Sequence, residues 1–376
     1  MSNTTIDAPL ASGNAASYLE FEKPLYRIQL EIEQLERDQI EGGRDFSADL
    51  KELRQRLKQM TKRLYSHLTA WETVLVARHP QRPLAPHYLG TMVRDFCEIH
   101  GDRLYGDDKA IITGFGRIGP HKVMVIGHNK GRDTTERIAC NFGCAHPEGY
   151  RKALRAMEMA EKFGLPVVCM IDTQGAFPGI GAEERGISSA IAVNLREMSR
   201  LKTPIVCCVI GEGGSGGALG IGVGDRVAMF EHSFYSVISP EGCAAILWRT
   251  GEQRKLAAES LKLTAKDLMR LNIIDSVIKE PLGGAHRDPA GTIASLEKYF
   301  TDSLRELKRY KVDTLLRKRY ERIRGLGSFF EKAADNAKAP VTDEKTQSRA
   351  KADGKITVKS PARPMHGMKR PSQTTV

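Results

Sequence analysis

The sequence predicts an α/β fold in which the central strands are buried. Residues 166–171 and 204–210 are short, almost wholly apolar runs, which is typical of strands covered on both faces of a sheet. Residues 183–202, which lie between these runs, have the spacing of an amphipathic helix. Because strands of this kind alternate with helices along the chain, we expect a parallel or mixed sheet.

The N-terminal part of the chain has the pattern of two long helices. Residues 18–77 have a helical pattern that is interrupted only by the glycine pair 42–43. Apolar residues recur at spacings of three and four in the second half, which places them on one face of a helix. These residues are Leu50, Leu53, Leu57, Met60, Leu64 and Leu68. We therefore expect a helical hairpin and linker over residues 18–83, ended by Pro80 and Pro83.

The following segment, residues 84–328, has the pattern expected of the main domain. Residues 110–118 and 122–127 predict a β-hairpin. Residues 147–163 predict a helix, which begins at a proline and is followed by Gly164. Further strands are predicted at residues 226–230, 234–238 and 274–278, and a long final helix at about residues 292–309.

The composition favours a cytoplasmic protein with no membrane partner. No run approaches the roughly 20 apolar residues that a membrane helix needs. Residues 1–17 are polar, do not resemble a signal peptide and are expected to be disordered. The seven cysteines are odd in number, and several lie within apolar runs, as buried thiols do in a reducing compartment. Cys140 and Cys144 have no second ligand pair at zinc spacing, so we expect no metal site.

The positive charge is concentrated in the C-terminal tail. The net charge is +11, but residues 331–376 contain ten Lys and Arg against five Asp and Glu, so +5 of it lies there. No aromatic residue follows Phe330, so we expect a basic, disordered tail over residues 329–376. The modest remaining excess disfavours nucleic acid as the main partner, while binding of the tail to an acidic partner stays open.

A glycine-rich turn at residues 211–217 is the strongest functional feature. Five of its seven residues are glycine, and it follows a buried strand and precedes a short helix. The first N–H groups of a helix lack partners, and glycine lets a ligand approach them closely. We interpret the turn as a site for an anion or for a developing negative charge, where one such donor is typically worth roughly 3 to 4 kcal/mol of barrier.

Other motifs also match this turn. Residues 213–217 fit the G-x-S-x-G pattern, with Ser215 as a nucleophile and His232 or His286 as its base. The glycines fit a dinucleotide fingerprint with Glu231 downstream, although the helix that follows is too short and rich in glycine. A P-loop is excluded because no Lys-Ser/Thr pair follows. The glycines could also serve only to allow close packing of the backbone.

A second turn of the same type lies at residues 171–181. It again follows a buried strand and precedes a helix, and it contains Gly175 and Ala176. Two such turns at the ends of successive strands are expected to converge on one crevice. Asp172 could act in catalysis, but an aspartate at a strand end more commonly accepts hydrogen bonds from nearby backbone N–H groups.

Several short segments together match one family pattern. They are residues 21–24, 77–83, 101–103, 141–143, 147–154, 181–186, 211–217, 239–243 and 280–287. Over about residues 18–320 the chain thereby resembles the alpha subunit of the carboxyltransferase component of bacterial acetyl-coenzyme A carboxylase. The resemblance implies a crotonase-like (ClpP/crotonase) fold of repeated β-β-α units, in addition to the helical hairpin and the tail.

The resemblance also implies an activity and partners. With a beta subunit, in an α2β2 assembly, the chain would move the carboxyl group of carboxybiotin to acetyl-coenzyme A and give malonyl-coenzyme A. This is the first committed step of fatty acid synthesis. Biotin carboxyl carrier protein would present the biotin, biotin carboxylase would complete the complex, and the beta subunit would hold the zinc, so no metal is expected in this chain.

Particular residues take roles by the same resemblance. The N–H groups of Gly213 and Gly214 would stabilise the ureido oxygen of biotin. The expected substrate contacts are Gly175, Ala176, Gly211 and Ser215. Gln174 and Phe177 depart from the proline and tyrosine usual in the family, which leaves the second turn looser. The alternatives are a crotonase-like acyl-coenzyme A hydratase or isomerase, a carboxyltransferase for another acyl-coenzyme A, and a serine hydrolase.

Overall fold

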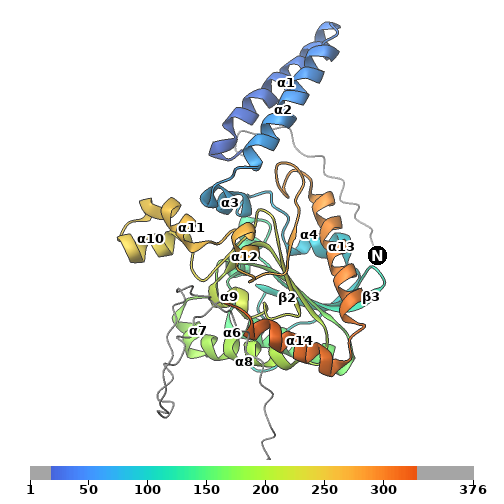
Figure 1. Ribbon diagram of the computed structural model, residues 1–376, viewed down its shortest axis with the longest axis vertical. Coiled ribbons are helices and arrows are strands. Elements are labelled where there is room, and N and C mark those ends of the chain that lie inside the picture. Colours follow the sequence, from blue (N-terminus) through green and yellow to red (C-terminus); the bar gives the residue numbers. More distant parts are fainter. Residues whose placement is uncertain (1–17, 328–376) are drawn as a thin grey trace, which may run out of the picture.

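The computed structural model describes residues 18–327, drawn in colour in Figure 1. Our expectations of disorder concern residues 1–17 and the basic tail, which lie outside the described part of the chain. Within it, a helical hairpin projects from a body in which helices surround one sheet.

The hairpin consists of α1 (Lys23–Gly42) and α2 (Ser47–Tyr65), which pack along each other as the sequence predicts. Ile28 and Leu50 are buried between them, together with leucines of the predicted apolar stripe. Helix α1 is followed by Gly43, whose φ of 62° lies in the left-handed region that glycine adopts easily. The hairpin points away from the body (Figure 1), so its inner apolar face is covered mainly by its own two helices.

One mixed sheet forms the core of the body. Its strands lie in the order β1-β2-β3-β4-β5-β6-β8, with β7 beside the end of β5. The first three strands are antiparallel and all later pairs are parallel, which confirms the predicted hairpin and mixed sheet. The strands are β1 (Arg94–Glu98), β2 (Ile111–Ile118), β3 (His121–His128), β4 (Val167–Thr173), β5 (Ile205–Gly214), β6 (Arg226–Phe230), β7 (Phe234–Ser236) and β8 (Ser276–Ile278).

Helices cover both faces of this sheet. Alternate residues of β4 point to opposite faces, so Cys169 packs in a cluster with α6 and α8, while Met170 packs in another with α4 and α13. The helices of the body are α3 (Ala70–Ala77), α4 (Ala85–Met92), α5 (Thr134–Ala139), α6 (Pro147–Lys162), α7 (Ile180–Glu184), α8 (Ile187–Arg200), α9 (Ser215–Leu219), α10 (Pro240–Trp248), α11 (Arg254–Leu261), α12 (Ala265–Arg270), α13 (Pro289–Leu307) and α14 (Val312–Arg324).

The structure differs from the sequence-based prediction in a few elements. The helix predicted over residues 183–202 is divided by Gly186, whose φ is 77°. Strand β1 and helices α4, α5 and α14 are additional. Strand β1 is an exposed edge strand without the apolar run by which the other strands were predicted. Most important for the site, β5 continues to Gly214, so the first half of the predicted glycine turn is strand.

Candidate functional site

The candidate site lies where β5 ends and α9 begins. The strand ends at Gly214, and Ser215 is the first residue of the helix. Ser215 has a φ of 51°, a left-handed conformation that is uncommon for a residue with a side chain. The chain therefore turns sharply between strand and helix, as expected for a functional turn.

The two predicted glycine turns meet at this point. A Cβ atom on Gly214 would lie only 2.0 Å from the carbonyl oxygen of Gln174. A Cβ atom on Gly217 would lie 2.4 Å from the carbonyl carbon of Gly175. Real Cβ atoms essentially never approach another atom within 3.0 Å, so only glycine allows these contacts. The structure thus brings together the two segments that the sequence predicts to converge.

Close packing also explains other glycines of the segment. A Cβ atom on Gly211 would lie 2.6 Å from Asp172 Oδ1, and one on Gly213 would lie 2.8 Å from the ring of Tyr235. Gly216 is different, because the nearest atom to its Cβ position is Ile191 Cδ1 at 3.6 Å, an ordinary contact. The packing interpretation therefore accounts for much of the glycine run, and it does not conflict with a binding role at the same place.

Backbone groups of the predicted site residues differ in accessibility. Gly211, Gly213 and Gly214 are buried, whereas Ser215 is half-buried. In the second turn, Gly175 is half-buried, but its N–H already donates to Thr173 Oγ1 at 3.1 Å. Its carbonyl oxygen in turn accepts a hydrogen bond from Thr173 Oγ1 at 2.7 Å, so a contact of Gly175 with substrate would mainly involve its lack of a side chain. Its neighbour Ala176 is half-buried as well.

A cavity of about 560 Å³ begins at Ser215 and Gly216. Its volume lies within the range of about 300 to 1,000 Å³ that is usual for small-molecule sites. Its walls are mostly apolar, and none of the described residues that line it is a histidine, aspartate or glutamate. The lining includes Leu219, Val223, Tyr235, Val237, Leu261 and Ile273. The cavity can therefore hold an apolar ring system, but it offers no side-chain carboxylate or imidazole for proton transfer.

The structure separates Ser215 from its candidate bases. His232 lies against the ring of Tyr65, with the ring centroids 5.4 Å apart, and His286 stacks on His79. Neither His232 nor His286 lines the cavity at Ser215. A serine nucleophile requires a base within hydrogen-bond reach, so the described residues do not form the arrangement of a serine hydrolase.

A buried network of charges lies on the other side of the turn. Lys130 Nζ is 2.6 Å from Asp172 Oδ1 and 2.8 Å from Glu212 Oε1. Arg78 Nε is 2.9 Å from the second oxygen of Glu212. Burial alone would raise the pKa of Glu212, but Lys130 and Arg78 outweigh it and hold that pKa below its usual value. These groups line a smaller cavity of about 210 Å³, which also includes Gln174.

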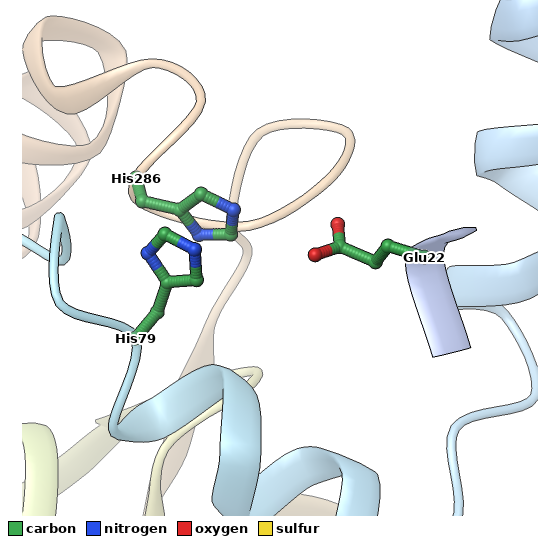
Figure 2. A group of neighbouring side chains, drawn as sticks. All are labelled: Glu22, His79 and His286. Carbon is green, nitrogen blue, oxygen red and sulfur yellow. The ribbon is translucent and has the colours of Figure 1, made fainter. Parts of the chain in front are cut away.

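A third buried cluster joins the hairpin region to the body. Figure 2 shows Glu22, His79 and His286, whose potential ligand atoms lie within 4.8 Å of one another. The two imidazole rings are stacked, with centroids 3.7 Å apart and planes 16° apart. Imidazole binds a metal through a lone pair in the ring plane, and nearly parallel rings do not direct these lone pairs to one point. In this arrangement the three residues form a packed junction, in which Glu22 also accepts a hydrogen bond from Tyr65 at 2.8 Å.

Comparison with known proteins agrees with this architecture. The family model described as acetyl co-enzyme A carboxylase carboxyltransferase-like matches residues 18–327. A protein of Burkholderia vietnamiensis named acetyl-coenzyme A carboxylase carboxyl transferase subunit alpha is 52% identical over 315 residues, which cover 84% of this chain and 98% of the relative. Proteins of the same name from Rhodopirellula baltica and Thiobacillus denitrificans are each 51% identical, covering 84% and 85% of this chain and 98% and 99% of the relatives.

The chain belongs to the family of acetyl-coenzyme A carboxylase carboxyltransferase alpha subunits. As a member, it is the alpha subunit of a multi-subunit transferase that moves a carboxyl group from a biotin-bearing substrate to an acyl-coenzyme A. The fold is the crotonase-like α/β fold of this family, and β2, β3 and α6 form one β-β-α unit of it. None of the described helices is long and apolar enough to cross a membrane.

Two solved structures illustrate the partial likeness of this alpha subunit to other proteins. The transcarboxylase 12S structure with methylmalonyl-coenzyme A has a TM-score of 0.47 at 20% identity, over 58% of this chain and 42% of the other. A Pseudomonas malonate decarboxylase hetero-tetramer with coenzyme A has a TM-score of 0.48 at 14% identity, over 57% and 86% of the two chains.

Sequence reasoning missed the charged residues around the turn. Lys130, Glu212 and Arg78 each lie in or beside segments singled out for other reasons, but their pairing depends on the fold. Arg78 and Glu212 are 134 positions apart, and Lys130 and Glu212 are 82 apart. The sequence contains one indication of these ion pairs, which is the glutamate within the glycine run directly after a buried strand. A buried carboxylate requires a partner.

Proposed function

We propose that this alpha subunit provides the biotin side of the carboxyl transfer to acetyl-coenzyme A. The N–H groups of Gly213 and Gly214 act as donors to the ureido oxygen of biotin. The substrate contacts are Gly175, Ala176, Gly211 and Ser215. The observation that supports this most is the meeting of the two glycine turns beside a mostly apolar cavity whose described lining has no carboxylate or imidazole.

The cavity at Ser215 and Gly216 fits a biotin ring. Its volume of about 560 Å³ and its mostly apolar walls suit a compact bicyclic group, and Ser215 and Gly216 of its lining directly follow the last residue of β5. Carboxybiotin supplies the carboxyl group, and its release leaves negative charge on the ureido oxygen. Backbone donors fixed at a strand end stabilise such a charge without having to reorganise, which is why glycine at this place is useful.

The same cavity argues against the other enzyme classes. A hydratase or isomerase needs a positioned acid or base to move a proton. The described lining of the cavity contains no carboxylate or imidazole; its ionisable side chains are Arg322 and Tyr235, and burial raises the pKa of the Tyr235 hydroxyl. The nearby carboxylates of Asp172 and Glu212 are paired with Lys130. In carboxyl transfer the released biotin can itself accept the proton, so this chain needs no side-chain base.

The partner in this proposal is a carboxyltransferase beta subunit in an α2β2 assembly. Leu219 and Val237 line the cavity and are 41% and 76% exposed, which is high for apolar residues beside a binding site. A second chain that covers them would also complete the site. Biotin carboxyl carrier protein and biotin carboxylase complete the complex, the protein is cytoplasmic, and the metal resides in the beta subunit and not in this chain.

The test is reconstitution with and without the beta subunit. We expect malonyl-coenzyme A to form from acetyl-coenzyme A and carboxylated carrier protein only when both chains are present. Substantial activity of this chain alone would reject the proposal that it provides only one half of the active site. Propionyl-coenzyme A in a parallel assay addresses the alternative acyl substrate, since a higher kcat/KM for it than for acetyl-coenzyme A would reassign the substrate but leave carboxyl transfer intact.

A further inference from the structure

Strand β5 contains an irregularity just before the candidate donors. Ile171 of β4 pairs with Val209 of β5, but Thr173 pairs with Gly213. Strand β5 therefore has two more residues than β4 between these pairs, and it must bulge over residues 210–212. A bulge interrupts the hydrogen-bonded ladder and redirects the strand, and bulges often lie next to active sites.

Two side chains satisfy the backbone groups of this bulge. Asp172 Oδ1 accepts a hydrogen bond from the N–H of Glu212 at 2.9 Å. Arg82 Nε donates to the carbonyl oxygen of Ile210 at 2.8 Å. Both groups are buried, where an unpaired backbone N–H or C=O would be costly. The bulge is thus held by a carboxylate at the Glu212 N–H and by a guanidinium group at the Ile210 carbonyl.

Each of these side chains is fixed by a buried partner of opposite charge. Lys130 Nζ lies 2.6 Å from the same oxygen of Asp172 that accepts from Glu212, and it also contacts the Glu212 side chain. Arg82 forms two bonds with Glu280, at 2.6 and 3.1 Å, and both of these side chains are almost fully buried. Fixed partners leave the two bonds to the bulge little freedom to move.

The bulge also explains why residue 211 is glycine. A Cβ atom there would lie 2.6 Å from Asp172 Oδ1, so it would push the carboxylate away from the Glu212 N–H. Beyond the bulge, Gly213 pairs with Thr173 on one side and with Tyr235 of β7 on the other. The place and direction of the strand end therefore depend on how the bulge is held.

We propose that Asp172 and Arg82 are positioning residues that hold the β5 bulge and so set the orientation of Gly213 and Gly214 for catalysis. The proposal rests on the proposed function, because it takes these two glycines as the donors. Lys130 and Glu280 act through Asp172 and Arg82 and contact no substrate in this scheme. Loss of Asp172 lowers the rate of the chemical step. It does not change the binding of acetyl-coenzyme A, because the partner chain binds that substrate.

The same strand offers a matched control at its opposite end. Asp225 Oδ2 accepts a hydrogen bond from the N–H of Ile205, the first residue of β5, at 2.8 Å. It also pairs with the buried Arg319 at 2.7 Å, and its side chain is 3% exposed, compared with 4% for Asp172. Asp225 thus has the same chemistry as Asp172, but it lies at the other end of the strand from Gly213.

The experiment compares Asp172→Ala, Asp172→Asn and Asp225→Asn in the full-length chain assembled with its beta subunit. Hydrogen exchange of residues 210–214 is measured together with kcat and KM. In Asp172→Ala we expect clearly faster exchange there and a fall in kcat of about 10- to 100-fold, with KM for acetyl-coenzyme A unchanged. Asparagine keeps an acceptor oxygen, so Asp172→Asn recovers part of both effects.

The control separates positioning from general stability. Asp225→Asn should speed exchange near Ile205 and leave kcat within about twofold of the wild-type value. Unchanged exchange of residues 210–214 in Asp172→Ala would overturn the proposal, as would an equal loss of kcat in Asp225→Asn. Faster exchange of residues 210–214 with unchanged kcat would instead show that the bulge is held as described, and would reject Gly213 and Gly214 as the donors.

Discussion

Replacing Gly214 with alanine tests the contact on which the candidate site depends. The new Cβ atom would lie 2.0 Å from the carbonyl oxygen of Gln174, and real contacts of this kind are not shorter than 3.0 Å. Either β5 or the Gln174 turn must therefore move by at least 1.0 Å. Gly214 has a φ of −96° and a ψ of 122°, which alanine adopts without strain, so the effect is purely steric.

The expected magnitude follows from this displacement. Adding a methyl group to a well-packed interior lowers the free energy of unfolding by about 1 to 3 kcal/mol. For a domain of this size each kcal/mol lowers Tm by roughly 2 to 4 °C, so we expect a fall of about 2 to 12 °C. A 1 Å misplacement of groups around a reacting centre costs about 100-fold in rate. The fall in kcat should therefore be larger than the loss of stability alone would cause.

Thermal unfolding and the reconstituted carboxyl-transfer assay measure the two effects. Gly216→Ala is the control for stability, because its Cβ atom would meet only Ile191 at 3.6 Å. We expect Gly216→Ala to keep the wild-type Tm or raise it slightly, since alanine favours the helix by up to about 1 kcal/mol. Wild-type Tm and kcat in Gly214→Ala would refute the close contact with Gln174 and the reasoning built on it.

Two further predictions concern single side chains near the site. Ser215→Gly should relieve the left-handed φ of 51° and keep kcat within a few-fold, whereas a loss of several orders of magnitude would identify Ser215 as a nucleophile. Burial, reinforced by Lys130, lowers the pKa of His128 to about 3, while the unfolded chain has the usual value near 6.5. Between these values only the unfolded state binds the proton, so the stability from His128 is complete above pH 6.5 and falls as the pH is lowered toward 3. From pH 6.5 to 5 the free energy of unfolding of the wild type should fall by about 2 kcal/mol through this group. His128→Gln lacks this titration, so urea unfolding at pH 7 and 5 should show a smaller fall for the variant. An equal fall in the two proteins would contradict the lowered pKa of His128.

Much of the local structure could be predicted because it depends on short-range patterns. The apolar stripe that includes Leu50 predicted the hairpin, and the proline at residue 147 and Gly164 marked the limits of α6 closely. Strand β1 could not be predicted in this way, because its residues are largely exposed and lack an apolar run. The division between α7 and α8 depends on the backbone angle of Gly186, which the sequence suggests only weakly.

The candidate site was predicted in part. The sequence indicated that the turns at Gly175 and Gly214 converge, and in the structure their backbones touch. It did not indicate that β5 continues to Gly214, because a run of glycines has low strand propensity and pairing with β4 and β7 overrides it. The roles assigned to Gly213 and Gly214 stay predictions until the donors are tested.

The sequence by itself determined the family, the order of helices and strands, and the segment in which the site lies. These properties depend on local patterns of a few residues, such as the glycine run at residues 211–217. Only the tertiary structure decided what each glycine allows and which charges hold the strand end. Asp172 meets Glu212, and Arg82 meets Ile210, across separations of 40 and 128 residues. Contacts at such distances depend on the packing of the whole sheet, which no local pattern records.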